Sequence, residues 1–150
     1  MTNETRVAGG CMCGRVRYEA DGPPLCVGHC HCESCRRHTG APIVTFVVFE
    51  AAKARFTHGD RRVYNSSPGV RRGFCEYCGT PLTWEGQYRG YAVIEFHIST
   101  LDDPDTYAPD RHWHFAERIS WFDVQDDLPR YRSTSAGTEP YCHGPASKSR

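Results

Sequence analysis

Long apolar runs are missing from this 150-residue sequence. The longest, over residues 43–49, still contains Thr45 and is far shorter than the roughly 18 residues that a membrane-spanning helix needs. The first ten residues contain no apolar segment of the kind that marks a secretory signal. We therefore expect a protein of the cytoplasm with no membrane partner.

An excess of charge is also missing, because 18 basic residues balance 18 acidic residues. Nucleic-acid-binding domains usually carry a strong basic excess, so we expect no nucleic-acid partner. Lysine is nearly absent, with only Lys53 and Lys148, and the other basic residues are arginines. The planar guanidinium of arginine suits carboxylates, which favours a small anionic ligand, although solvated surface arginines are the commoner explanation.

Helical periodicity is rare, whereas short stretches typical of β-strands recur between turn signals. The expected strands cover residues 15–20, 43–49, 56–64 and 91–99, and the third is a hairpin that turns at Gly59 and Asp60. The aromatic residues expected in the core of further strands are Trp113, Phe115, Trp121 and Phe122. This pattern predicts a mainly β fold.

Only two short helical turns are expected. The first covers residues 33–38 and ends before Gly40 and Pro42, and the second lies near residues 102–105. We place one domain at residues 1–132, which is a usual size for a single core. Residues 133–150 are rich in Ser, Thr, Gly and Pro and are expected to be a mobile tail, so Cys142 is not expected to bind a metal.

Nine cysteines are the most unusual feature of the composition. An odd number cannot pair completely, and a chain without a secretory signal keeps its thiols reduced, so metal binding is favoured over a disulfide scaffold. Apart from Cys26 and Cys142, the cysteines form three close groups. These groups are Cys11 and Cys13; Cys30, Cys32 and Cys35; and Cys75 and Cys78.

The spacing suggests two zinc sites with different roles. The first and third groups together supply four thiolates, which is the ligand set of a closed structural zinc. The middle group supplies three thiolates and leaves a fourth position vacant, as a catalytic zinc requires. Spacing alone supports equally a second structural zinc in which Cys26, His29 or His31 takes the fourth position, and it also allows other groupings of the cysteines.

Three motifs resemble those of the glutathione-dependent formaldehyde-activating enzyme family, which also includes centromere protein V. They are G-x-C-x-C-G at residues 9–14, C-x-C-x-x-C-R-x-x-x-G-A-P at residues 30–42, and F-C-x-x-C-G-T-x-L at residues 74–82. Residues 100–104 and 112–129 are also similar, so the resemblance covers about residues 8–131.

The resemblance implies a small zinc-stapled β-sandwich, the zinc-ribbon-related β-tent. By motif match, Cys11, Cys13, Cys75 and Cys78 hold the structural zinc, and Cys30, Cys32 and Cys35 hold the catalytic one. The family's reaction is of the carbon–sulfur lyase class and joins glutathione to formaldehyde, giving S-hydroxymethylglutathione. The rival hypotheses are a non-catalytic zinc-binding module for protein interaction and, more weakly, a thiol redox protein that uses Cys75 and Cys78.

Several residues near the middle group are candidates for catalysis or ligand binding. His31 is expected to act with the three cysteines as a proton carrier, and His38 is a second candidate, although either histidine is also compatible with a structural role. Arg36 and Arg37 directly follow Cys35 and are expected to hold glutathione carboxylates, with a solvated surface position as the alternative. Arg71 and Arg72 lie just before Cys75 and are a second such pair.

Overall fold

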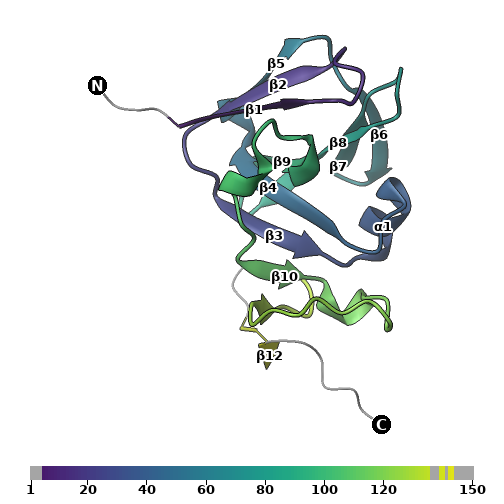
Figure 1. Cartoon of the computed structure of the whole chain (residues 1–150), viewed down its shortest axis with the longest axis vertical. Coiled ribbons are helices and arrows are strands. Elements are labelled where there is room, and N and C mark those ends of the chain that lie inside the picture. Colours follow the sequence, from purple (N-terminus) through teal and green to yellow (C-terminus); the bar gives the residue numbers. More distant parts are fainter. Residues whose placement is uncertain (1–4, 136–138, 141, 144–150) are drawn as a thin grey trace. The chain divides into compact units, whose positions relative to one another are not determined.

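The computed structural model describes residues 5–135, 139–140 and 142–143. The chain, shown in sequence colours in Figure 1, divides into two compact units. Unit 1 comprises Met1–Cys26 and Phe46–Ala108, and unit 2 comprises Val27–Thr45 and Pro109–Arg150. The fold is mainly β, as predicted from the short strand patterns.

Unit 1 contains two groups of antiparallel strands. The first is β1 (Arg6–Gly10), β2 (Arg17–Asp21) and β5 (Ala54–His58), in that order. The second runs in the order β4 (Val44–Glu50), β9 (Tyr91–His97), β8 (Pro81–Tyr88), β7 (Val70–Phe74) and β6 (Arg62–Ser67). Unit 1 also has three single 3₁₀ turns, one between β4 and β5 at Ala51–Lys53 and two after β9 at Ile98–Thr100 and Pro104–Thr106. The last of them confirms the short turn expected near residues 102–105.

The core of unit 1 forms around stacked aromatic rings. Tyr18 of β2 is fully buried, and its ring stacks on Phe96 of β9 with 3.8 Å between the ring centroids. On β4, residues 46–49 are all buried, which means that both faces of this strand are covered. The apolar run predicted as a buried strand is therefore confirmed, with its bounds shifted by one residue.

The hairpin predicted over residues 56–64 is wrong, although both of its strands exist. β5 pairs with β2, where Phe56 lies opposite Tyr18, while β6 pairs with β7. The segment between β5 and β6 passes close to another part of the chain at Gly59, where a Cβ would lie 2.1 Å from the carbonyl oxygen of Arg15. A local turn signal cannot show that the two strands it joins pair with different, distant partners.

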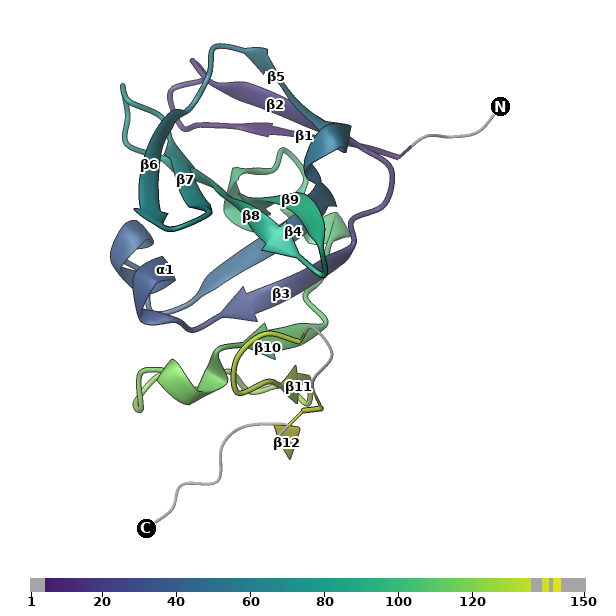
Figure 2. The ribbon, with the colours of Figure 1, turned by 180° about the vertical axis from the view of Figure 1, so that it is seen from behind.

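Unit 2 is built on four short strands and one helix. Its strands follow the order β12 (Cys142–His143), β11 (Pro129–Arg130), β10 (Arg111–Trp113) and β3 (Cys26–Cys30), which Figure 2 shows in succession. The helix α1 (Glu33–Thr39) follows β3, and a 3₁₀ turn at Phe115–Glu117 follows β10. The predicted helix is confirmed, and Gly40 ends it with a positive φ of 69° and a hydrogen bond from its N–H to the carbonyl of Arg36.

Two of the aromatic residues predicted for the core lie in the interior of unit 2, and a third does not. Trp113 and Phe115 are buried, and a Cβ at Gly28 would lie 2.6 Å from the Trp113 ring, so a glycine is needed where β3 and β10 meet. Trp121 is 76% exposed, and its assignment to the core is wrong. It lies in a turn after β10 and not on a strand, so no pairing turns it inward.

Within the described residues, no helix is both long and apolar enough to cross a membrane. The predicted tail of residues 133–150 lies largely outside the described residues.

Candidate metal centres

The first cysteine cluster lies in unit 1, where two turns meet. Cys11 and Cys13 lie between β1 and β2, Cys75 and Cys78 lie between β7 and β8, and their four Sγ atoms are within 4.8 Å of one another. Two of the Sγ–Sγ distances are 3.5 Å, between Cys11 and Cys13, and 3.8 Å, between Cys13 and Cys75. Zn–S bonds of about 2.3 Å in a tetrahedron place sulfurs about 3.8 Å apart, so this donor set fits zinc.

Each turn of this cluster is closed by a hydrogen bond from a glycine N–H to the carbonyl of its first cysteine, over three residues in one turn and four in the other. The N–H of Gly14 donates to the carbonyl of Cys11 at 3.1 Å, and the N–H of Gly79 donates to that of Cys75 at 2.8 Å. Both glycines have a positive φ, 76° and 77°, which explains the glycine in each motif. The N–H of Val16 also donates to the Sγ of Cys11 at 3.3 Å, as expected of a turn that supports a thiolate.

Thr80 supports the second pair of this cluster. Its Oγ1 accepts a 3.1 Å hydrogen bond from the N–H of Met12, which leaves the hydroxyl proton available to Cys78, 3.1 Å away. Hydrogen bonds from the side chain and backbone of Thr80 lower the pKa of Cys78 to about 5. A thiol with this pKa is a thiolate at neutral pH, which is the form that binds a metal.

The second cluster lies in unit 2, at the junction of β3 and α1. Cys30 ends β3, Cys32 caps the N-terminus of α1 and Cys35 lies in its first turn, with all three Sγ atoms within 4.8 Å of one another. The Sγ atoms of Cys30 and Cys35 are 3.7 Å apart, which also suits tetrahedral zinc. Hydrogen bonds from the Cys30 and Cys35 thiols lower the pKa of Cys32 to about 2, while the pKa of Cys30 is raised.

Three further residues were candidates for a fourth ligand in the second cluster. Among the described residues, Cys26, His29 and His31 do not belong to the group of atoms that the three cysteines form. Side chains alternate between the two faces of a strand, so His29 lies on the face of β3 opposite Cys30, and the imidazole of His31 contacts that of His112.

That opposite face carries a buried hydrogen-bonded chain. Nε2 of His31 is 2.8 Å from Nδ1 of His112, and Nε2 of His112 is 3.1 Å from both carboxylate oxygens of Asp126. Burial lowers the pKa of His31 to about 3 and that of His29 to about 4, so both are neutral near pH 7. Burial raises the pKa of Asp126, but hydrogen bonds led by that from Arg130 outweigh it, and the net shift is downward.

His112 and Asp126 are site residues that sequence reasoning did not single out. The signal available was their place within residues 112–129, one of the stretches that resemble the known family. Neither residue lies near a cysteine motif in the sequence, so spacing gave no reason to join them to His31.

The two arginines after Cys35 have different surroundings. Arg36 donates from Nε to the carbonyl of His31 and from Nη2 to the carbonyl of Glu117, both at 3.1 Å. The side chain of Arg37 is 79% exposed and forms an ion pair with Glu33 at 2.8 Å. Both arginines line a hollow of about 470 Å³ that also includes Pro42. Its other lining residues are Glu33, Gly40, Ala41, Ile119 and Trp121.

The second candidate for a proton carrier, His38, lies on α1 and is half-buried.

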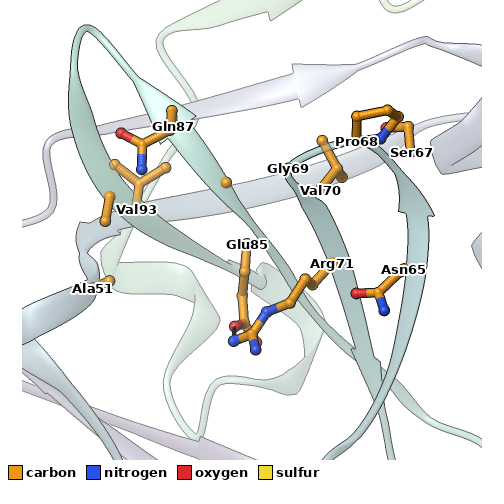
Figure 3. Close-up of a pocket in the computed structure, with 12 residues that line it drawn as sticks. Ala51, Asn65, Ser67, Pro68, Gly69, Val70, Arg71, Glu85, Gln87 and Val93 are labelled. Carbon is orange, nitrogen blue, oxygen red and sulfur yellow. Dashed lines mark hydrogen bonds and ion pairs between the residues drawn. The ribbon is translucent and has the colours of Figure 1, made fainter.

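The second arginine pair, in unit 1, is engaged with other side chains. Arg71 pairs with Glu85 in a hollow of about 720 Å³, where Figure 3 shows the two side chains pointing toward each other. Glu85 also binds Arg61 at 2.8 Å. Arg72 is buried and donates to the hydroxyl of Ser66 at 3.1 Å.

Three comparisons with known proteins find proteins similar to this chain. The sequence profile of the glutathione-dependent formaldehyde-activating enzyme family matches residues 6–117. A protein of Schizosaccharomyces pombe described as an uncharacterized lyase is 28% identical over 134 residues, covering 79% of this chain and 91% of its own. A crystal structure of a Rhodobacter sphaeroides protein superposes with a TM-score of 0.54 and 22% identity, covering 71% of this chain and 98% of its own. The last match shows similarity of fold.

Proposed function

The chain belongs to the glutathione-dependent formaldehyde-activating enzyme family, and on that basis we propose that it is a zinc-dependent enzyme of the carbon–sulfur lyase type. Its substrate in this proposal is a glutathione adduct, and the simplest reaction joins glutathione to formaldehyde. The C–S bond of S-hydroxymethylglutathione forms as the thiol proton passes to the former carbonyl oxygen, so atoms and charge balance without a redox partner. The relative described as a lyase supports this reaction class.

The observation that carries the proposal is the three-cysteine cluster at the junction of β3 and α1. Its three sulfurs fit a tetrahedral zinc site, and Cys26, His29 and His31 do not join them as a fourth ligand. When bound there, zinc supplies Lewis-acid chemistry and stabilises a thiolate near neutral pH. The four-cysteine cluster has its full set of ligands and is assigned to stability.

The surroundings of α1 suit a ligand that carries carboxylates. Arg37 is exposed at the hollow, and its partner Glu33 is exposed as well, so a ligand carboxylate can displace a surface ion pair of low strength. Glutathione has two carboxylates and is of a size that a hollow of about 470 Å³ accommodates. We assign the binding of one carboxylate to Arg37, and to Arg36 through those N–H groups that its two carbonyl partners leave unused.

A cytoplasmic location follows from the same proposal, because thiolate sites of this kind need cysteines that stay reduced. All eight cysteines from Cys11 to Cys78 are free thiols in the structure.

Glutathione binding at the three-cysteine cluster is tested with cobalt-substituted protein. Cobalt–thiolate charge-transfer absorption should change as glutathione is added, because a fourth sulfur enters the cluster. S-methylglutathione is the matched control, since its blocked sulfur cannot ionise and should leave the band unchanged. No response to glutathione at millimolar concentration would contradict the proposal and favour the non-catalytic zinc-binding module.

A further inference from the structure

A second group of metal-ligating side chains lies in unit 2, apart from the cysteines. We propose that His29, His112 and Asp126 form a third metal site, made of two imidazoles and one carboxylate, for a divalent cation such as zinc or iron(II). One ligand atom from each of the three residues lies within 4.8 Å of the other two. This inference does not depend on the proposed function.

The fold brings these residues together through strand register. β3 and β10 are parallel neighbours, and His112 is the register partner of His29. Paired residues on adjacent strands direct their side chains to the same face, so the two imidazoles lie side by side, with ring centroids 4.9 Å apart. β10 also pairs with β11 at His112 and Arg130, and Asp126 comes just before β11. Three sequence segments therefore meet at one point of the sheet.

The contact between His112 and Asp126 brings a ring nitrogen close to both carboxylate oxygens. Nε2 of His112 is 3.1 Å from Oδ1 and 3.1 Å from Oδ2 of Asp126. The nitrogen is equally distant from the two oxygens, which suits a proton shared with both of them and also suits a cation bound beside them. Separations of about 3 Å are also usual between neighbouring ligands around zinc, whose bonds to nitrogen and oxygen are about 2.0–2.2 Å.

Each of the three residues is held by a partner outside the group. Nδ1 of His29 shares a 2.7 Å hydrogen bond with the hydroxyl of Thr45, and Nδ1 of His112 shares a 2.8 Å hydrogen bond with His31. These contacts occupy Nδ1 of each ring, so the nitrogens that would bind a cation are Nε2 of His29 and Nε2 of His112, which faces Asp126. Metal-binding histidines are usually held in this way, by a hydrogen bond from the ring nitrogen that does not bind the metal.

The third residue, Asp126, is held from two sides. Its Oδ1 accepts 2.8 Å and 3.1 Å hydrogen bonds from Arg130 and from the N–H of Leu128, and these leave Oδ2 free of both. The positive charge of Arg130 acts against a cation nearby. Two main-chain carbonyls partly compensate the charge of Arg130, because its guanidinium also donates to the carbonyls of Leu128 and Val124 at 2.7 Å and 2.8 Å.

The donor set indicates which metals this site takes. Imidazole and carboxylate ligands suit zinc, cobalt and iron(II), and two histidines with one carboxylate also form the ligand triad of non-haem iron proteins. The cysteine clusters offer only sulfur, so the two kinds of site are distinguishable by spectroscopy. The side chain of Asp126 is 24% exposed, which gives a cation an approach from solvent.

The test is a cobalt(II) titration of the purified full-length protein after its cysteine sites have been filled with zinc. We expect one further equivalent of cobalt to bind, with weak ligand-field absorption and no added sulfur charge-transfer band. His29→Ala and Asp126→Asn should each weaken this binding at least tenfold, while the zinc content of the cysteine sites is unchanged. His29 is only partly buried, so His29→Ala keeps the test valid if variants of the fully buried His112 fail to fold.

The matched control is the His114–Glu117 pair, a second histidine–carboxylate contact of unit 2 at 3.1 Å, which no third ligand joins among the residues that the structure describes. His114→Ala should leave cobalt binding unchanged. The proposal would be overturned if cobalt showed only the absorption of a sulfur-bound ion. It would also be overturned if the parent, His29→Ala and Asp126→Asn proteins bound cobalt with equal affinity. His112 and Asp126 would then share only a proton.

Discussion

Nε of Arg36 donates a 3.1 Å hydrogen bond to the carbonyl oxygen of His31, closing the turn that carries the three-cysteine cluster. The same guanidinium reaches the carbonyl of Glu117, so it joins this turn to the 3₁₀ turn after β10. Arg36 therefore has a structural contact in addition to the ligand-binding role expected of it. Arg37, one residue further, makes only a surface ion pair among its described contacts. The two arginines should consequently respond differently to substitution.

Arg37→Ala should weaken glutathione binding about tenfold to a hundredfold without changing the metal content. A charge-assisted contact contributes about 1.5–3 kcal/mol, and raising the salt concentration should reproduce part of the loss. Calorimetric titration at two ionic strengths measures both effects. Arg62→Ala, which removes an exposed arginine of unit 1, is the control. Equal affinities of the Arg37→Ala and parent proteins would show that this side chain only faces solvent.

Arg36→Ala should weaken glutathione binding to a similar degree and should also speed metal loss from the three-cysteine cluster. Two hydrogen bonds to main-chain carbonyls disappear, and each contributes about 1 kcal/mol or somewhat more because the donor is charged. Metal release to a chromophoric chelator, compared with Arg37→Ala, separates the two roles. Identical release rates in the two variants would show that Arg36 does not hold the turn.

Cys78→Ala should prevent stable folding of the domain. The four-cysteine cluster joins the β1–β2 turn to the β7–β8 turn, and structural zinc supplies on the order of 10 kcal/mol of binding energy, comparable to the stability of a whole domain. Thermal melting and metal analysis are the measurements, with Cys142→Ala as the control. A cooperative melt and normal metal content in Cys78→Ala would contradict this assignment.

Cys32→Ala should remove about one metal ion per chain and the activity, while the fold persists. Cys30, Cys32 and Cys35 lie within six residues of one another, so their metal links no distant segments. Metal analysis, circular dichroism and an assay of S-hydroxymethylglutathione formation check this outcome. Unfolding as complete as that expected for Cys78→Ala would instead assign the middle cluster to stability.

Acid should destabilise unit 1 through Glu85. Burial raises the pKa of the Glu85 carboxyl, but hydrogen bonds led by that from Arg61 lower it by more than burial raises it. The pKa of Glu85 therefore lies below 4.5 in the folded state. The unfolded state then binds more protons near pH 4, and the free energy of unfolding falls as the pH drops through that range.

Urea unfolding at about pH 6 and about pH 4 should show a steeper loss of unfolding free energy in the parent than in Glu85→Gln. The variant itself should be less stable at neutral pH by about 3 kcal/mol, because Arg61 loses its buried partner. Parallel pH dependences in the two proteins would rule out this role.

Sequence patterns predicted the elements of this fold better than their partners. The apolar run before Glu50 and the helix that ends at Gly40 are both confirmed, because each depends on residues close in sequence. The hairpin at Gly59 is wrong because strand pairing is decided by distant contacts, in this case that of Phe56 with Tyr18.

By itself, the sequence determined the mainly β character of the protein and the cysteine sets that are able to hold metal, since spacing within each motif limits where thiolates can converge. Only the tertiary structure decided what surrounds those sets. Alternation along β3 directs His29 away from Cys30, the parallel register with β10 places His29 opposite His112, and the segment before β11 adds Asp126. Residues more than 80 positions apart come together through hydrogen bonding between strands, for which no local pattern exists.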